Sequence, residues 1–183
     1  MKTLGRIVHL LALGLWFGSV MFFSFFTALP IIRHMETQAA RPSHWLKLED
    51  KKQGVRVAGE ALEPVFARYF PLQIICGAAA ILTLRAWHGG LPKLGRARLG
   101  LIALAFLLAC LNTFWLARTV HALRTERYDL DPVVAQRAQE AFSAWHSYSL
   151  WTDMAGLACL ALGFALAAVP PRTPAAGGTS GAV

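Results

Sequence analysis

Three polar side chains on one face of a predicted membrane helix are the best candidates for chemistry in this chain. Ser149 and Asp153 follow His146 by three and seven residues, so all three share one helical face. At about 1.5 Å per residue, Asp153 lies roughly 10 Å deeper in the membrane than His146. Ionisable groups in lipid are costly and normally face a bundle interior or a wet cavity, often with a partner. We expect Asp153 and His146 to lead a ligand or ion site, with Arg68 or His146 as the partner of Asp153. The alternative is that Asp153 is protonated, because burial disfavours a charged carboxylate.

Polar residues of the other predicted helices reach the same depth. Consecutive helices cross in opposite directions, so Gln73 early in the second and Asn112 late in the third approach the same membrane face. Ser24 and Thr27, at the end of the first, do so too. We call this face side B, and the N-terminal face side A. The convergence predicts a polar pocket open to side B and closed toward side A. The competing interpretation is that these residues only join the helices by hydrogen bonds or belong to emerging helix ends.

Four long apolar stretches must position these side chains. A helix needs about 20 mostly apolar residues to span the hydrocarbon core. Because backbone groups in lipid need internal partners, the stretches must be helical. The sequence predicts an all-α integral membrane four-helix bundle, one domain over residues 1–169, with a disordered tail at 170–183. The four spans are approximately residues 7–29, 69–87, 99–117 and 148–169.

Two antiparallel hairpins with helix extensions on side B are expected outside the membrane. Arg118–Arg127 contains no helix breaker, and Asp131 followed by Pro132 is typical of an N-cap and a first helical residue. The turn of this hairpin is then Tyr128–Asp131. The connection Ile31–Pro64 between the first two spans is expected to be interrupted at Pro42, Gly54 and Gly59, with Val57, Leu62 and Val65 on an amphipathic lead-in to the second span.

The net charge of +8 does not indicate nucleic-acid binding. The basic residues flank the spans rather than forming one patch, which suits anionic lipid headgroups and membrane insertion. The predicted partner is the lipid bilayer, with a homo-oligomer or a larger membrane complex left open. A bacterial inner membrane is the expected location, but the basic residues do not decide the orientation. Three cysteines lie inside the spans, where we expect buried thiols rather than disulfides: Cys76, Cys110 and Cys159.

Two histidines near side A are candidates for binding haem or a metal. His9 begins the first span and His88 ends the second, so both approach the same interface. Histidine is the usual axial ligand of membrane haem. His9 and His146, however, lie at opposite faces and cannot ligate one iron. The alternative is that His9 and His88 are ordinary interfacial side chains.

Several short motifs resemble the transmembrane-protein-205-like family. The first span carries His9-Leu10-Leu11, Trp16 and the aromatic run Phe22–Phe26. The later matches are Phe70-Pro71, Asn112 with Trp115-Leu116, and His146 with Ser149. The resemblance covers most of the chain and implies a four-helix membrane protein without supplying a reaction. A fainter likeness, His9 followed by Trp16, is to haem-associated protoporphyrinogen oxidase and copper-resistance membrane proteins.

The function hypothesis is a non-enzymatic multi-pass membrane protein. It binds or passes a small polar solute, a proton or a metal ion in the one-sided pocket. No nucleophile–base pair, phosphate-binding loop or metal-ligand motif stands out, so an enzyme is not expected. One alternative is a haem or redox protein that uses His9. The other is a non-catalytic accessory subunit of a membrane complex, for which the protruding hairpin is the working surface.

Overall fold

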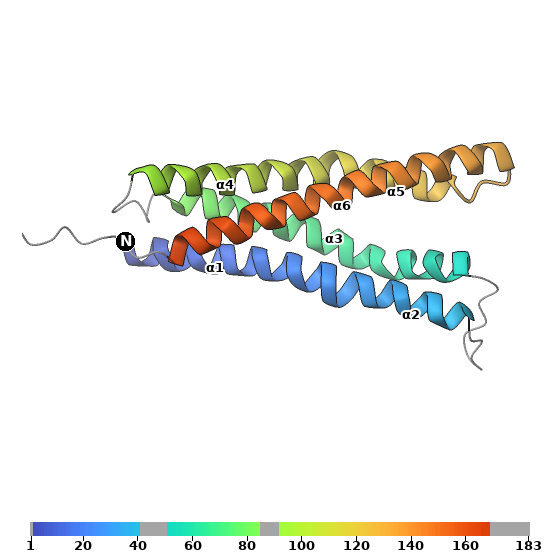
Figure 1. Ribbon diagram of the computed structural model, residues 1–183, viewed down its shortest axis with the longest axis horizontal. Helices are drawn as coiled ribbons and strands as arrows, with labels where there is room; N and C mark the ends of the chain where they lie inside the picture. The colour runs from blue at the N-terminus through green and yellow to red at the C-terminus, as the bar shows by residue number, and fades with distance from the viewer. Residues whose placement is uncertain (1, 41–50, 85–91, 169–183) are drawn as a thin grey trace, which may run out of the picture.

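Two long helical hairpins lie side by side and form an elongated bundle (Figure 1). This computed structural model describes residues 2–40, 51–84 and 92–168, with side chains at 3–38, 53–84 and 95–166. The predicted all-α four-helix bundle is confirmed, and the described ranges contain no strand. Four helical rods are long and apolar enough to cross a membrane: Thr3–Gln38, Gln53–Thr83, Gly95–Glu126 and Pro132–Leu166. The chain is therefore a multi-pass membrane protein.

The first hairpin begins with a rod that continues well beyond the predicted span. It comprises α1 (Lys2–Met21), the π-helical η1 (Phe22–Ala28) and α2 (Leu29–Ala40). Its partner is α3 (Lys51–Thr83). The wide π-helical stretch ends two residues before Pro30. Proline lacks the N–H that an α-helix needs and crowds the preceding turn, which is the setting in which a helix widens.

The predicted breaks at Gly54 and Gly59 are wrong, whereas the expected lead-in to the second span is helical. Helix continues to Ala40 and resumes at Lys51, so Gly54 and Gly59 lie inside α3. The reason is tertiary packing, which overrides the weak helix propensity of glycine. Ile31 and Leu62 both pack into the hydrophobic core, so the two extensions stabilise each other. Pro42 lies outside the described residues.

The second hairpin confirms the predicted extensions on side B. One rod comprises α4 (Pro92–Leu111), the π-helical η3 (Asn112–Leu116) and α5 (Ala117–Glu126). The other is α6 (Pro132–Ala168). Asp131 caps α6, because its Oδ1 accepts a hydrogen bond from the Val133 N–H at 2.8 Å.

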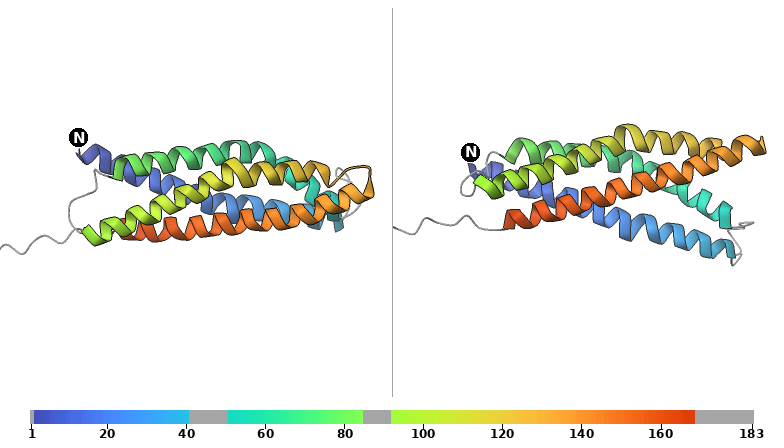
Figure 2. Two further views of the ribbon diagram at one scale, coloured as in Figure 1. Left: turned by 90° about the horizontal axis from the view of Figure 1, so that it is seen from above. Right: turned by 45° about the horizontal axis from the view of Figure 1, so that its top comes forward.

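The two hairpins are joined through α1 with α6 and α3 with α4, as the two further views make clear (Figure 2). Trp16, Ile102 and Leu160 are buried at this junction. Gly77 permits the close approach, since a Cβ there would lie 2.9 Å from Trp16 Cη2 and collide with the Phe106 ring. On side B, the Arg124 guanidinium donates to the Gly59 carbonyl at 2.9 Å and ties α5 to α3.

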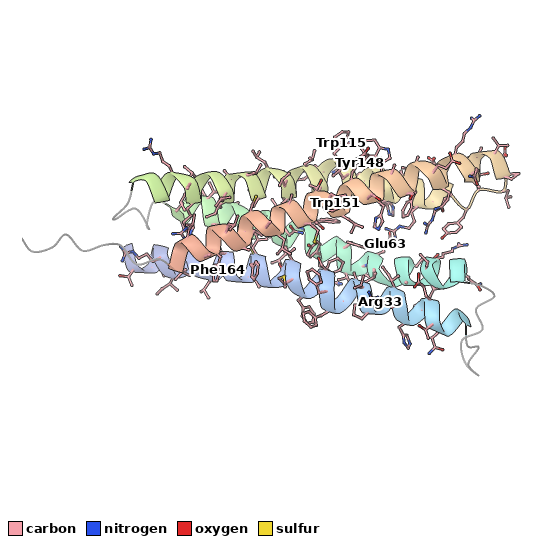
Figure 3. All side chains as sticks on the ribbon, in the orientation of Figure 1. Arg33, Glu63, Trp115, Tyr148, Trp151 and Phe164 are labelled. Carbon is pink, nitrogen blue, oxygen red and sulfur yellow. The ribbon has the colours of Figure 1, made fainter. Side chains whose placement is uncertain are left out.

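Aromatic side chains on the second hairpin indicate where the bilayer surface lies. The ring centroid of Trp145 lies 5.5 Å from that of Trp115 and 5.9 Å from that of Tyr148. The labelled Trp115 and Tyr148 project from the same side of the bundle (Figure 3). Tryptophan and tyrosine concentrate at membrane–water interfaces. At about 1.5 Å per residue, Asn112 and Asp153 then lie about 5–10 Å below the side B interface.

Candidate functional site

The centre of the candidate site is a hydrogen-bonded group that joins η3 to α6. The Asn112 Nδ2 donates to Asp153 Oδ1 at 2.6 Å, and the Ser149 hydroxyl donates to Asn112 Oδ1 at 2.7 Å. Asn112 is only 1% exposed. Asn112 opens the π-helical stretch η3, where the wider turn changes the direction of the side chains that follow. The sequence predicts these three residues at one depth, and the structure brings them into direct contact.

The first hairpin contributes Trp16 and Gln73 from the opposite side. Both side chains are buried, and the Trp16 indole N–H donates to Gln73 Oε1 at 3.5 Å. They share a small pocket with Asp153. The space open to the centre of a water molecule is about 10 Å³, about enough for a single water. The pocket lining is Trp16, Val20, Gln73, Ala105, Ala109, Thr152, Asp153, Gly156, Leu157 and Leu160.

Tyr69 continues the polar core one turn from Gln73 toward side B. It is 5% exposed, and Ser24 and Gln73 lie beside its hydroxyl, with the Asp153 charge also within reach. Neither Trp16 nor Tyr69 is among the site residues that the sequence predicts. The available signal was that Tyr69 and Gln73 are four residues apart in an apolar segment, hence on one helical face.

The predicted partners of the Asp153 carboxylate are wrong. Arg68 is exposed, and its guanidinium donates to the Pro64 carbonyl at 3.4 Å. His146 stacks on Phe142, with ring centroids 5.4 Å apart, and lies near the guanidinium groups of Arg124 and Arg127. The reason is helix rotation and depth: Arg68 faces outward, and His146 is nearly two turns above Asp153. The carboxylate is bonded to the neutral amide of Asn112 instead.

His9 occupies a separate position near side A. Its ring is completely buried, which differs from the interfacial alternative. The Nδ1 lies 2.9 Å from the Ala80 carbonyl oxygen and 3.1 Å from the Thr83 hydroxyl, so the ring joins α1 to α3. Arg98, which is also buried, is near enough for its charge to act on His9. His88 and the predicted tail at 170–183 lie outside the described residues.

The donor atoms of the site are mostly neutral oxygens and amides around one carboxyl group. Within the described ranges, no group of three or more His, Cys, Asp or Glu side chains is placed to hold a metal ion. Cys76, Cys110 and Cys159 are free thiols. Chemically, these groups can hydrogen-bond to water, and the carboxyl group can take up or release a proton.

A comparison with known protein families finds a match over most of the chain. Residues 11–129 match the family described as Domain of unknown function (DUF4149). The chain belongs to this family. The matched segment of this DUF4149 protein contains Trp16, Tyr69, Gln73 and Asn112, whereas Ser149 and Asp153 of α6 lie beyond it. No curated protein and no solved structure matches the chain.

Proposed function

We propose that this multi-pass membrane protein binds a proton at Asp153, in exchange with the water on side B. The observation that carries the proposal is the carboxyl group of Asp153, which bonds to Asn112 and lines a water-sized pocket within the bundle. A bare carboxylate in a low-dielectric interior is costly unless a positive charge balances it.

The neighbours of Asp153 supply no such charge. Among the described residues, no Lys, Arg or His forms an ion pair with it. Its hydrogen-bond donor, the Asn112 amide, is neutral. A proton is therefore the simplest balancing charge. A Ca²⁺ ion takes about six to eight oxygen ligands, whereas among the described residues no group of three or more His, Cys, Asp or Glu side chains is placed to hold a metal ion.

The size of the pocket favours a proton over a polar solute. Space for about one water molecule admits a proton carried by water, and no organic solute fits without separation of the helices. Proton exchange is useful where a membrane holds a proton gradient, so a bacterial inner membrane remains the proposed location. We also propose that the chain is related to the transmembrane-protein-205-like proteins, which is compatible with this role.

A haem-dependent role for His9 is not favoured by its surroundings. A haem ligand must offer one ring nitrogen to an open, haem-sized space. The His9 ring is enclosed between α1 and α3, with Nδ1 at the Ala80 carbonyl. A Soret band in the purified protein would restore the haem hypothesis.

A second candidate function is that of an accessory subunit or homo-oligomer. In the most apolar 18-residue stretch of each rod, only 11% of the residues of α6 are buried, compared with 28–33% in the other three rods. The outer face of α6, with Trp151 and Leu162, is therefore free to contact lipid or a partner helix. A stoichiometric partner that co-purifies in mild detergent, combined with an inert Asp153, would favour this function.

The test of proton binding uses the protein in liposomes and a change of pH. We expect the infrared C=O band of one carboxyl group to appear on acidification and to be absent in Asp153→Asn. Glu140→Gln, which changes an exposed carboxylate on the same helix, is the matched control and should keep the band. An Asp153→Asn protein that folds and still shows the same band and proton uptake would rule the proposal out.

A further inference from the structure

The hydroxyl group of Tyr69 is a buried polar atom that the packing alone does not explain. The side chain is 95% buried, and within the described residues its hydroxyl has no hydrogen-bond partner at good distance and angle. Ser24 and Gln73 nevertheless lie beside it. Buried polar groups are normally satisfied, either by a direct partner or through a bridging water. The Tyr69 hydroxyl is therefore placed to exchange a proton with the Ser24 hydroxyl, directly or through one water.

The helix directions place Tyr69 between the Asp153 pocket and side B. Gln73 lines the pocket together with Asp153, and Tyr69 precedes Gln73 by one turn in α3, which runs from side B to side A. Ser24 follows Trp16 by two turns in the opposite direction. Ser24 is partly exposed, unlike Tyr69 and Gln73. From the pocket toward side B, the polar side chains thus follow in the order Gln73, Tyr69 and Ser24.

Aromatic rings close this region to bulk water. The ring of Phe23 stacks on Tyr69 with centroids 4.3 Å apart and contacts Phe66 edge-on at 5.0 Å. Phe23 and Tyr69 are both buried. A proton that moves along this side of the pocket must therefore pass through hydroxyl groups and individual waters rather than through an open channel.

From this geometry, we propose that Tyr69 relays protons between the Asp153 pocket and Ser24 near side B. The inference rests on the proposed proton binding at Asp153. On release, the Asp153 O–H bond breaks and the pocket water accepts its proton. The Tyr69 hydroxyl accepts a proton from the water on its pocket side and gives its own proton toward Ser24 and bulk water. One proton leaves, and a carboxylate remains at Asp153. A proton-transfer group can act directly or through one bridging water.

The test compares the rate and the amplitude of proton exchange after a rapid pH jump, with the Asp153 infrared band as the signal. Tyr69→Phe keeps the ring stack and removes only the hydroxyl. We expect exchange to slow by at least about tenfold, because a positioned proton-transfer group contributes about 10²–10⁴-fold. The amplitude should not change. Tyr148→Phe is the matched control, since this tyrosine is 60% exposed on α6 and should exchange at the wild-type rate.

The outcomes separate the relay from the proposed function. If the band is present but Tyr69→Phe exchanges within twofold of wild type, the relay is refuted and proton binding stands. If the wild-type protein shows no infrared band that depends on Asp153, proton binding at Asp153 is refuted, and the relay is refuted with it. Ser24→Ala provides a second variant should Tyr69→Phe not fold. It should slow exchange as well, and an unchanged rate in that variant also overturns the relay.

Discussion

The hydrogen bond between Asn112 and Asp153 should couple the two hairpin rods that it joins. At 2.6 Å it is short, and its acceptor is a carboxyl oxygen. Hydrogen bonds between neutral groups contribute about 0.5–1.5 kcal/mol and those to charged groups about 1.5–3 kcal/mol, whereas interhelical bonds in membrane bundles average about 0.6 and reach about 1.7 kcal/mol. We predict a coupling energy of about 1–2 kcal/mol, or about 5–30-fold in the folding equilibrium.

The single substitution Asn112→Ala should be costlier than the coupling energy. It removes the bond to Asp153 and the acceptor of the Ser149 hydroxyl, and it leaves a small cavity at a residue that is 1% exposed. Unsatisfied partners and lost packing together predict a loss of about 2–4 kcal/mol in the free energy of unfolding.

The assay is a double-mutant cycle with Asn112→Ala, Asp153→Ala and the double variant, unfolded by detergent titration in mixed micelles. The pair Arg56–Glu60 is the control, because its 2.9 Å contact is similar in length but lies between half-exposed side chains. Its coupling should not exceed about 0.5 kcal/mol. A coupling for Asn112 and Asp153 no larger than that of the control would show that the buried network does not hold α6 in place.

Two further predictions concern packing and capping. Gly77→Ala should destabilise the bundle by about 1–3 kcal/mol and change Trp16 fluorescence, because its Cβ would meet the Trp16 and Phe106 rings; Gly14→Ala, with no atom within 4 Å, should not be destabilising. Asp131→Ala should cost about 0.5–2 kcal/mol and speed hydrogen exchange in the first turn of α6, and unchanged exchange there would show that the cap is not needed.

The sequence by itself was enough to predict the class of fold and the common level of Asn112, Ser149 and Asp153 along the bundle. Apolar length required four membrane helices, since lipid offers the backbone no other hydrogen-bond partners. Asp131 and Pro132 marked the start of α6 because capping is a local interaction. The alternation of helix direction was sufficient to bring Asn112, Ser149 and Asp153 to one level, and the structure places them in contact.

Only the tertiary structure decided which side chains face one another at that level. In a span that is apolar on nearly every face, the pattern of residues does not reveal how a helix is rotated. The partner of Asp153 is therefore Asn112 rather than Arg68 or His146. Trp16 and Tyr69 also line the polar interior, which the sequence pattern does not predict. The π-helical stretches η1 and η3 add to this, because each widens a turn and re-aims the side chains beyond it. Depth follows from counting residues along one chain, whereas contact depends on packing between segments that are distant in sequence.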